Sequence, residues 1–185
     1  GKILVQNAVN GLGTAVIAGF AAATRLESFI NILGNSGSAA ISTFVAQNRG
    51  AQKFDRAFHG FYKGALMLCI FGQALAGLLY VCADKGLVFF LGNEAASISA
   101  GVNYLHAVCP LYVLSYVGSS CVGLFRGFGF MRVVFWGTSL QIATRAILAN
   151  LYASQYGLPA IGYATLFGWL LIVLYQAFMY YKNFK

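Results

Sequence analysis

Long apolar segments constrain the fold of this chain more than any other feature of its sequence. They cover about residues 13–47, 61–82, 101–125, 133–152 and 161–181. A helix of about 20 mostly apolar residues crosses the hydrocarbon core of a bilayer. None of the segments alternates with the period of two that barrel strands show. Because only helices and closed barrels satisfy their backbone polar groups in lipid, the sequence predicts an all-α polytopic membrane protein.

The composition supports this prediction and excludes other classes. Hydrophobic residues make up 59% of the chain and charged residues 9%, against about 45–50% and about 25% in soluble domains. A disordered tail, a collagen-like rod and an ordinary soluble enzyme are excluded. The 4 cysteines occur singly in or beside apolar runs, so neither a disulfide framework nor a metal site is predicted.

The charges are strongly unbalanced, with 12 Lys+Arg against 4 Asp+Glu and a formal net charge of +8. A basic excess can indicate nucleic-acid binding, but alternation of the spans gives it another meaning. One membrane side collects Lys2, Arg49, Lys53, Arg56, Lys63, Arg126, Arg132, Lys182 and Lys185, and the other collects Lys85. Cytoplasmic loops carry such an excess. We therefore expect a multi-pass protein of the plasma or inner membrane with a cytoplasmic C-terminus and no nucleic-acid partner.

The segments between the spans complete this topology. Residues 48–56 and 126–132 form basic turns, and the stretch GLVFFLG within residues 83–100 is expected to be a short interfacial helix. Residues 1–10 are apolar but too short to span and are interrupted by Gln6 and Asn7. We interpret them as the remnant of a preceding helix, and the chain as part of a longer protein.

A polar stripe follows the first span. At about 100° per residue its members fall within an arc of about 80°; they are Glu27, Asn31, Asn35, Ser38 and Ser42. Ionisable groups at membrane depth are costly and face a cavity or a partner. The stripe predicts either a cation or proton path with Glu27 as acceptor, or interhelical hydrogen bonds with Glu27 paired to a base such as Arg145. Arg25 points nearly opposite to Glu27, and its role and that of Arg145 stay open between function and pairing.

The third span contains Pro110, which removes a backbone hydrogen bond and bends a helix. Discontinuous helices at mid-membrane mark transporter binding sites, although a bend can also serve packing alone. Tyr112 and Tyr116 share a face and offer π surfaces to an organic cation. His106, near the end of the span, is interpreted as an interfacial polar residue.

Two sequence patterns suggest families. Residues 34–37 match the GxSG pattern of intramembrane serine proteases, but the activating histidine would have to be His59 or His106, both near helix ends. A more extensive pattern resembles the multidrug and toxic compound extrusion (MATE) family. The residues that carry it are Arg25, Glu27, Phe29, Gly37–Ala40, Phe44–Ala51 (FVAQNRGA), Arg56, Tyr104-Leu105, Leu124–Gly129 (LFRGFG) and Gly157–Gly162 (GLPAIG).

The resemblance implies a fold and an activity. The MATE family has twelve helices in two six-helix lobes, and this chain resembles the second lobe, with its first helix truncated and Gly13–Gln47 as the eighth helix. The implied function is secondary active efflux, by alternating access, of organic cations or other amphiphilic drugs in exchange for sodium ions or protons. No enzymatic activity and no cofactor beyond the coupling ion are expected. The implied partners are the substrate, the bilayer and an N-terminal lobe of the same polypeptide.

The resemblance also suggests site residues. Some members place ion-binding carboxylates on the seventh and tenth helices, but residues 101–125 contain no Asp or Glu, which leaves Glu27 as the acidic residue within a span. The predicted pathway comprises Arg25, Glu27, Asn31, Asn35, Ser38, Tyr112 and Tyr116, and the predicted structural or gating turns comprise Gln47, Asn48, Gly50, Ala51, Arg56, Arg126 and Gly127. A lipid-linked oligosaccharide flippase of the same superfamily remains an alternative.

Overall fold

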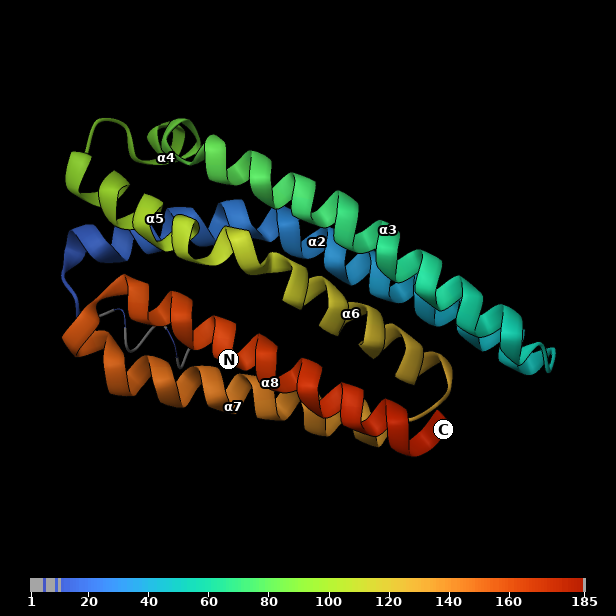
Figure 1. The fold of residues 1–185 in the computed structure, drawn as a ribbon. Coiled ribbons are helices and arrows are strands. Elements are labelled where there is room, and N and C mark those ends of the chain that lie inside the picture. Colours follow the sequence, from blue (N-terminus) through green and yellow to red (C-terminus); the bar gives the residue numbers. More distant parts are fainter. Residues whose placement is uncertain (1–4, 6–8, 10, 185) are drawn as a thin grey trace.

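The computed structural model describes residues 5, 9 and 11–184, and the described residues form a bundle of helices joined by short turns (Figure 1). The elements, in chain order, are α2 (Thr14–Gly50), α3 (Phe54–Val81), α4 (Ala83–Leu91), α5 (Ala95–Val108), the 3-10 turn η1 (Cys109–Leu111), α6 (Tyr112–Gly127), α7 (Met131–Tyr156) and α8 (Leu158–Phe184). The predicted helix remnant at 1–10 lies mostly outside the described residues. The predicted all-α class is confirmed.

Helix α2 is the organising element of the bundle. Helices α3, α5 and α6 pack along it, whereas α7 packs mainly against α8 and makes only a small contact with α6 (Figure 1). Helix α8 in turn contacts α5 and α6. The α7–α8 pair therefore forms a second layer beside the α2–α6 layer, and the two layers face each other over part of their length.

Glycines let α6 approach α2 closely. A Cβ atom added at Gly123 would lie 2.6 Å from the carbonyl oxygen of Ser38, and one at Gly127 would lie 2.7 Å from Cβ of Val45. Small residues four positions apart are the usual means by which membrane helices bring their backbones together. This contact fixes the register of α6 against the polar stripe of α2.

The expected bend at Pro110 is confirmed. Helix α5 ends at Val108, residues Cys109–Leu111 form a 3-10 turn, and α6 begins at Tyr112. Proline cannot donate the backbone hydrogen bond of a continuous helix. The predicted short helix within residues 83–100 is also present as α4, which ends at Leu91.

The predicted spans are all helical, but they differ in how apolar they are. Within the described residues, Thr14–Gly50, Phe54–Val81, Ala95–Gly127 and Leu158–Phe184 are long and apolar enough to cross a membrane. The predicted span at 133–152 forms α7, whose 26 residues give about 39 Å of helix. It is not in that group, because Arg132, Gln141 and Arg145 interrupt its apolar character.

Most of the basic side chains gather at one end of the bundle. The α2–α3 turn, the α6–α7 turn and the C-terminal end of α8 lie at the same end in Figure 1. The described cations there are Arg49, Lys53, Arg56, Arg126, Arg132 and Lys182. We call this the basic end. Lys85, on α4, lies at the opposite end, while Lys2 and Lys185 are outside the described residues.

Candidate functional site

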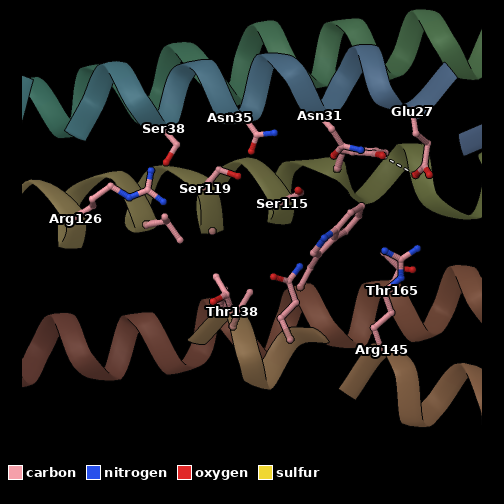
Figure 2. Close-up of a pocket in the computed structure, with 16 residues that line it drawn as sticks. Glu27, Asn31, Asn35, Ser38, Ser115, Ser119, Arg126, Thr138, Arg145 and Thr165 are labelled. Atoms are coloured by element: carbon pink, nitrogen blue, oxygen red, sulfur yellow. Dashed lines mark hydrogen bonds between the residues drawn. The ribbon is translucent and has the colours of Figure 1, made fainter. Parts of the chain in front are cut away.

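A polar cavity of about 550 Å³ lies between the two helix layers (Figure 2). Its lining comprises Glu27, Asn31, Asn35 and Ser38 of α2, Tyr112, Ser115, Gly118, Ser119, Val122 and Arg126 of α6, Thr138, Gln141 and Arg145 of α7, and Thr165, Trp169 and Ile172 of α8. Ligand pockets for drug-sized molecules have about 300–1,000 Å³, so the cavity is large enough for one.

The α2 wall of the cavity is the stripe recognised in the sequence. Glu27, Asn31, Asn35 and Ser38 line it in order along the helix (Figure 2). Ser42, the last member of the stripe, is not part of the lining, because a Cβ atom at Gly127 would lie 2.8 Å from its carbonyl oxygen, where α6 covers α2. The cavity therefore ends toward the basic end, where the two helices come into contact.

The carboxylate of Glu27 is held by two tyrosine hydroxyls. Tyr112 donates to Oε1 at 2.6 Å and Tyr104 donates to Oε2 at 3.1 Å. Tyr104 belongs to α5 and Tyr112 begins α6, so the bend at Pro110 brings donors from both helices to one carboxylate. Glu27 is buried, and hydrogen bonds from hydroxyl groups offset the cost of burying its charge.

Arg145 faces Glu27 from the other layer. Figure 2 shows its side chain rising from α7 toward the part of the cavity where Glu27 lies. Its Nε atom is buried without a hydrogen-bond partner. Opposite charges that share a weakly solvated cavity favour each other's charged form. The structure thus brings together the two residues for which the sequence left pairing open. We call this part of the cavity the Glu27 end.

The other part of the cavity contains Arg126, with Ser38 and Ser119 near it in Figure 2. Ser38 is buried, and its Oγ atom has no hydrogen-bond partner. Arg126 lies on the last turn of α6 and is exposed. Thr138 approaches from α7 across the cavity. We call this part the Arg126 end.

Two predicted pathway residues lie elsewhere. Tyr116 is fully buried between α2 and α3, where its hydroxyl donates to the carbonyl oxygen of Ile30 at 3.4 Å. Arg25 is exposed, and its guanidinium lies over the ring of Phe90 on α4, 5.9 Å from the centroid. Neither residue lines the cavity, because Tyr116 lies in the interface with α2 and α3 and Arg25 points toward α4. Their role in the pathway stays a prediction.

The predicted turn residues lie at the basic end, and among them Arg126 lines the cavity. Asn48 closes α2 by donating from Nδ2 to the carbonyl oxygen of Phe44 at 2.8 Å. The neighbouring Arg49 donates to the carbonyl oxygen of Phe128 at 2.5 Å, which ties the α2 end to the α6–α7 turn. Gln47, Gly50, Ala51 and Arg56 are exposed around these turns. These residues connect the two turns, and Arg126 is the one of them that lines the cavity.

Several lining residues escaped the sequence analysis. They are Ser115, Ser119, Thr138, Gln141, Thr165 and Trp169. One signal was available, because Thr138, Gln141 and Arg145 recur at helical spacing and fall within about 60° on α7. No sequence signal separates Trp169 from the other aromatic residues of the chain, which serve core packing and the membrane interface.

The geometry does not support a serine protease. Ser36 is exposed and lies outside the cavity lining. His59 Nδ1 contacts the carbonyl oxygen of Asp55 at 3.0 Å, and His106 Nε2 contacts that of Tyr80 at 3.2 Å, so each ring is engaged on its own helix or its neighbour. A catalytic histidine would instead hydrogen-bond the serine.

Comparison with known proteins decides the family. The family model described as MatE matches residues 1–150. The chain belongs to the MatE family. Members of this family are transporters and not enzymes, and the chain is accordingly a multi-pass membrane protein.

Individual relatives of this MatE chain are longer than it is. A Bacillus subtilis (strain 168) protein named probable multidrug resistance protein YoeA is 31% identical over 93 residues, which are 50% of this chain and 20% of that protein. An inward-facing multidrug resistance MATE family transporter of the MOP superfamily superposes with a TM-score of 0.85 at 17% identity, covering 100% of this chain and 42% of its own.

A MOP superfamily transporter from Pyrococcus furiosus superposes with a TM-score of 0.88 at 18% identity, and the match covers 99% of this chain and 40% of that one. The structure of that protein is described as having a binding pocket of reverse polarity that suggests a different function. At this level of identity the likeness shows the fold. The MatE chain therefore spans about two fifths of the solved transporters that it resembles.

Proposed function

We propose that this chain is the second lobe of a secondary active transporter that exports organic cations or other amphiphilic drugs in exchange for sodium ions or protons. The observation that carries the proposal is the cavity of about 550 Å³, whose wall contains a buried carboxylate held by two tyrosine hydroxyls. The name of the Bacillus relative, a probable multidrug resistance protein, agrees with it. A first lobe would complete the pathway.

Glu27 is the proposed coupling residue. An ionised carboxylate accepts both tyrosine hydroxyl hydrogens, whereas a protonated one keeps a proton that must itself be donated. Proton or sodium binding at Glu27 therefore changes the hydrogen bonds that join α2 to α5 and α6. These helices meet at the bend around Pro110. The change would bias the bundle between two packings and so between two cavity openings, as alternating access requires.

The proposed orientation puts the basic end in the cytoplasm of the plasma or inner membrane. Arg49, Lys53 and Arg56 border one turn at this end, and Arg126 and Arg132 border the next. Such clusters of cations near the ends of spans stay on the cytoplasmic side. The C-terminal end of α8 would then be cytoplasmic as well (Figure 1).

The test is Glu27→Gln in the full-length protein, expressed in a bacterial host that lacks its own efflux pumps. We expect drug resistance to fall toward that of the empty vector at an unchanged amount of protein in the membrane. The matched control is Glu94→Gln, which makes the same change at a carboxylate outside the cavity that accepts a hydrogen bond from Ser97.

Full resistance in the Glu27→Gln strain would contradict the coupling role. If the wild-type protein conferred no resistance but moved a fluorescent lipid between leaflets, the oligosaccharide-lipid flippase would replace the drug exporter.

A further inference from the structure

The charges that line the cavity are predominantly positive. The chain has 4 acidic residues, all among the described ones, and Glu27 is the one that lines the cavity. The others, Asp55, Asp84 and Glu94, lie at helix ends. Two arginines line it, and arginine stays protonated in proteins. This lobe therefore presents two positive charges and at most one negative charge to a bound molecule.

The negative charge lies where a ligand has least access to it. Both oxygens of Glu27 accept hydrogen bonds from buried tyrosines, and Arg145 lies at the same end of the cavity. The Arg126 end is distant from it, since Ser38 lies about 17 Å farther along α2 than Glu27. The attraction between two charges falls with their separation, and Figure 2 shows Arg145, not Arg126, at the Glu27 end. Glu27 therefore acts mainly on Arg145 and less on Arg126.

Groups that bind anions gather at the Arg126 end. The guanidinium of Arg126 offers N–H donors, and the hydroxyls of Ser38, Ser119 and Thr138 line the same region (Figure 2). The Oγ atom of Ser38 is buried in a residue that is 6% exposed and has no partner within the protein. Guanidinium and hydroxyl donors together match carboxylate, sulfonate or phosphate oxygens. An ammonium group placed there would meet Arg126 and no carboxylate.

The Glu27 end also holds two aromatic side chains of the lining. The rings of Tyr112 and Trp169 have centroids 4.8 Å apart, and Trp169, 6% exposed against 1% for Tyr112, presents the larger edge to the cavity. Aromatic faces of this kind pack against flat apolar groups. The cavity thus combines an anion-binding end with an aromatic end.

We propose that this cavity recognises aromatic amphiphiles by an anionic group, a carboxylate, sulfonate or phosphate, bound at the Arg126 end while the ring system lies toward the aromatic end beside Trp169. The inference rests on the proposed export function and narrows its substrate from amphiphiles in general to acidic ones. The positive excess of the lining makes organic cations the poorer ligands.

Two xanthene dyes of nearly the same shape test this directly. Fluorescein is anionic and rhodamine 123 is cationic, and the binding of each to the full-length protein in nanodiscs is measured by fluorescence anisotropy. We expect fluorescein to bind more tightly. Arg126→Gln should weaken fluorescein about tenfold, the value of a charge-assisted hydrogen bond, and should leave rhodamine 123 unchanged or bound more tightly.

The controls separate a local effect from a general one. Arg132→Gln removes a cation from the same end of the bundle but outside the cavity lining, and it should leave both affinities unchanged. Arg126→Lys keeps the charge and should retain most of the fluorescein binding. Ser38→Ala should weaken fluorescein by at least about threefold, because it removes one hydroxyl donor to the anionic group. If Arg126→Gln does not fold, these last two variants still decide the question.

Tighter binding of rhodamine 123 by the wild type, or an equal effect of Arg126→Gln on both dyes, would overturn the inference. Ion-driven uptake of both dyes into everted vesicles distinguishes this failure from a failure of the proposed function. Export of both dyes, with fluorescein export insensitive to Arg126→Gln, would contradict the anion site and support the proposed export function. Selective binding of fluorescein without transport of either dye would contradict the proposed export function and support the anion site.

Discussion

The two ends of the cavity solve the problem of buried polar groups in opposite ways. At the Glu27 end, the carboxylate receives hydroxyl donors from Tyr104 and Tyr112, so the protein satisfies its own buried charge. At the Arg126 end, Ser38 is equally buried but its hydroxyl has no partner in the protein. An unsatisfied buried polar group costs about 1–3 kcal/mol. The first arrangement adds stability, whereas the second leaves donors for a ligand.

A second buried polar side chain without a partner, Gln176, lies on α8 beyond the cavity lining. Gln176 on α8 is 1% exposed, and neither atom of its amide has a partner. It lies one turn after Ile172, a lining residue, and near Gly118 of α6, where an added Cβ atom would be 3.8 Å from its Oε1. Groups of this kind in native proteins are associated with water, ions or ligands. The unpartnered polar atoms thus extend along the α6–α8 side of the cavity.

Among the variants that test this difference between the two ends, removal of the Glu27 carboxylate should change stability the most. Glu27→Leu would leave two buried hydroxyls without an acceptor and Arg145 without an opposing charge. We expect a loss of about 2–6 kcal/mol of unfolding free energy, since each of the two buried hydroxyls left without an acceptor costs about 1–3 kcal/mol. Denaturant unfolding of the full-length protein measures it. Glu27→Gln, which keeps an acceptor, should lose much less, and equal losses in the two variants would contradict the network.

Single hydroxyl deletions should separate the two tyrosines that the sequence grouped together. Tyr112→Phe removes a 2.6 Å hydrogen bond to a carboxylate and should cost about 1.5–3 kcal/mol. Tyr116→Phe removes a 3.4 Å hydrogen bond to a carbonyl oxygen and should cost at most about 1 kcal/mol. The two variants are compared in the same unfolding assay. A larger loss of unfolding free energy in Tyr116→Phe than in Tyr112→Phe would contradict a strong hydrogen bond between Tyr112 and Glu27.

At the Arg126 end the same kind of deletion should not destabilise the protein. Ser38→Ala removes a buried hydroxyl that has no partner in the protein, so we expect the unfolding free energy to stay the same or to rise by up to about 3 kcal/mol. The loss of the hydroxyl should instead weaken the binding of anionic ligands. Thermal stability of the ligand-free protein checks this expectation. A loss of more than about 1 kcal/mol would show that Ser38 is a structural residue like those at the Glu27 end.

The smallest effect is expected outside the cavity, at Arg25. Its contact with Phe90 is exposed, and such cation–π pairs contribute about 0.5–1 kcal/mol. Arg25→Gln should therefore change stability slightly and leave drug efflux intact, whereas Arg145→Gln, the same change on the cavity wall, should impair efflux. Efflux assays on both variants at equal membrane levels test this. Loss of efflux in Arg25→Gln alone would return that residue to the pathway.

Local sequence patterns predicted the elements well because each depends on a short stretch of chain. The stripe from Glu27 to Ser38 follows from helical periodicity, and the break at Pro110 follows from the missing backbone N–H. The grouping of cations at the basic end follows from the order of spans. The helix ends were predicted less accurately than the helices themselves. Helix α3 begins at Phe54, whereas the apolar pattern begins at residue 61, because the helix extends beyond its apolar part.

Which face of each helix meets which neighbour was not available from these patterns. Tyr112 and Tyr116 share a face of α6, yet one reaches Glu27 and the other enters the α2–α3 interface. Arg25 and Arg145 both interrupt apolar segments, yet the guanidinium of Arg25 lies over Phe90 of α4 and Arg145 lines the cavity. These differences arise from contacts between residues far apart in sequence, which no single stretch encodes.

The sequence by itself determined a helical membrane protein with a polar stripe on one helix, a break in another and its cations at one end. Periodicity, chain length and the backbone chemistry of proline suffice for that. Only the tertiary structure decided that Tyr104 and Tyr112 hold Glu27, that Arg126 and Arg145 share its cavity, and that Ser38 remains unpartnered. The reason is that charge balance in a cavity depends on how separate helices pack, and close packing at Gly123 and Gly127 sets that register.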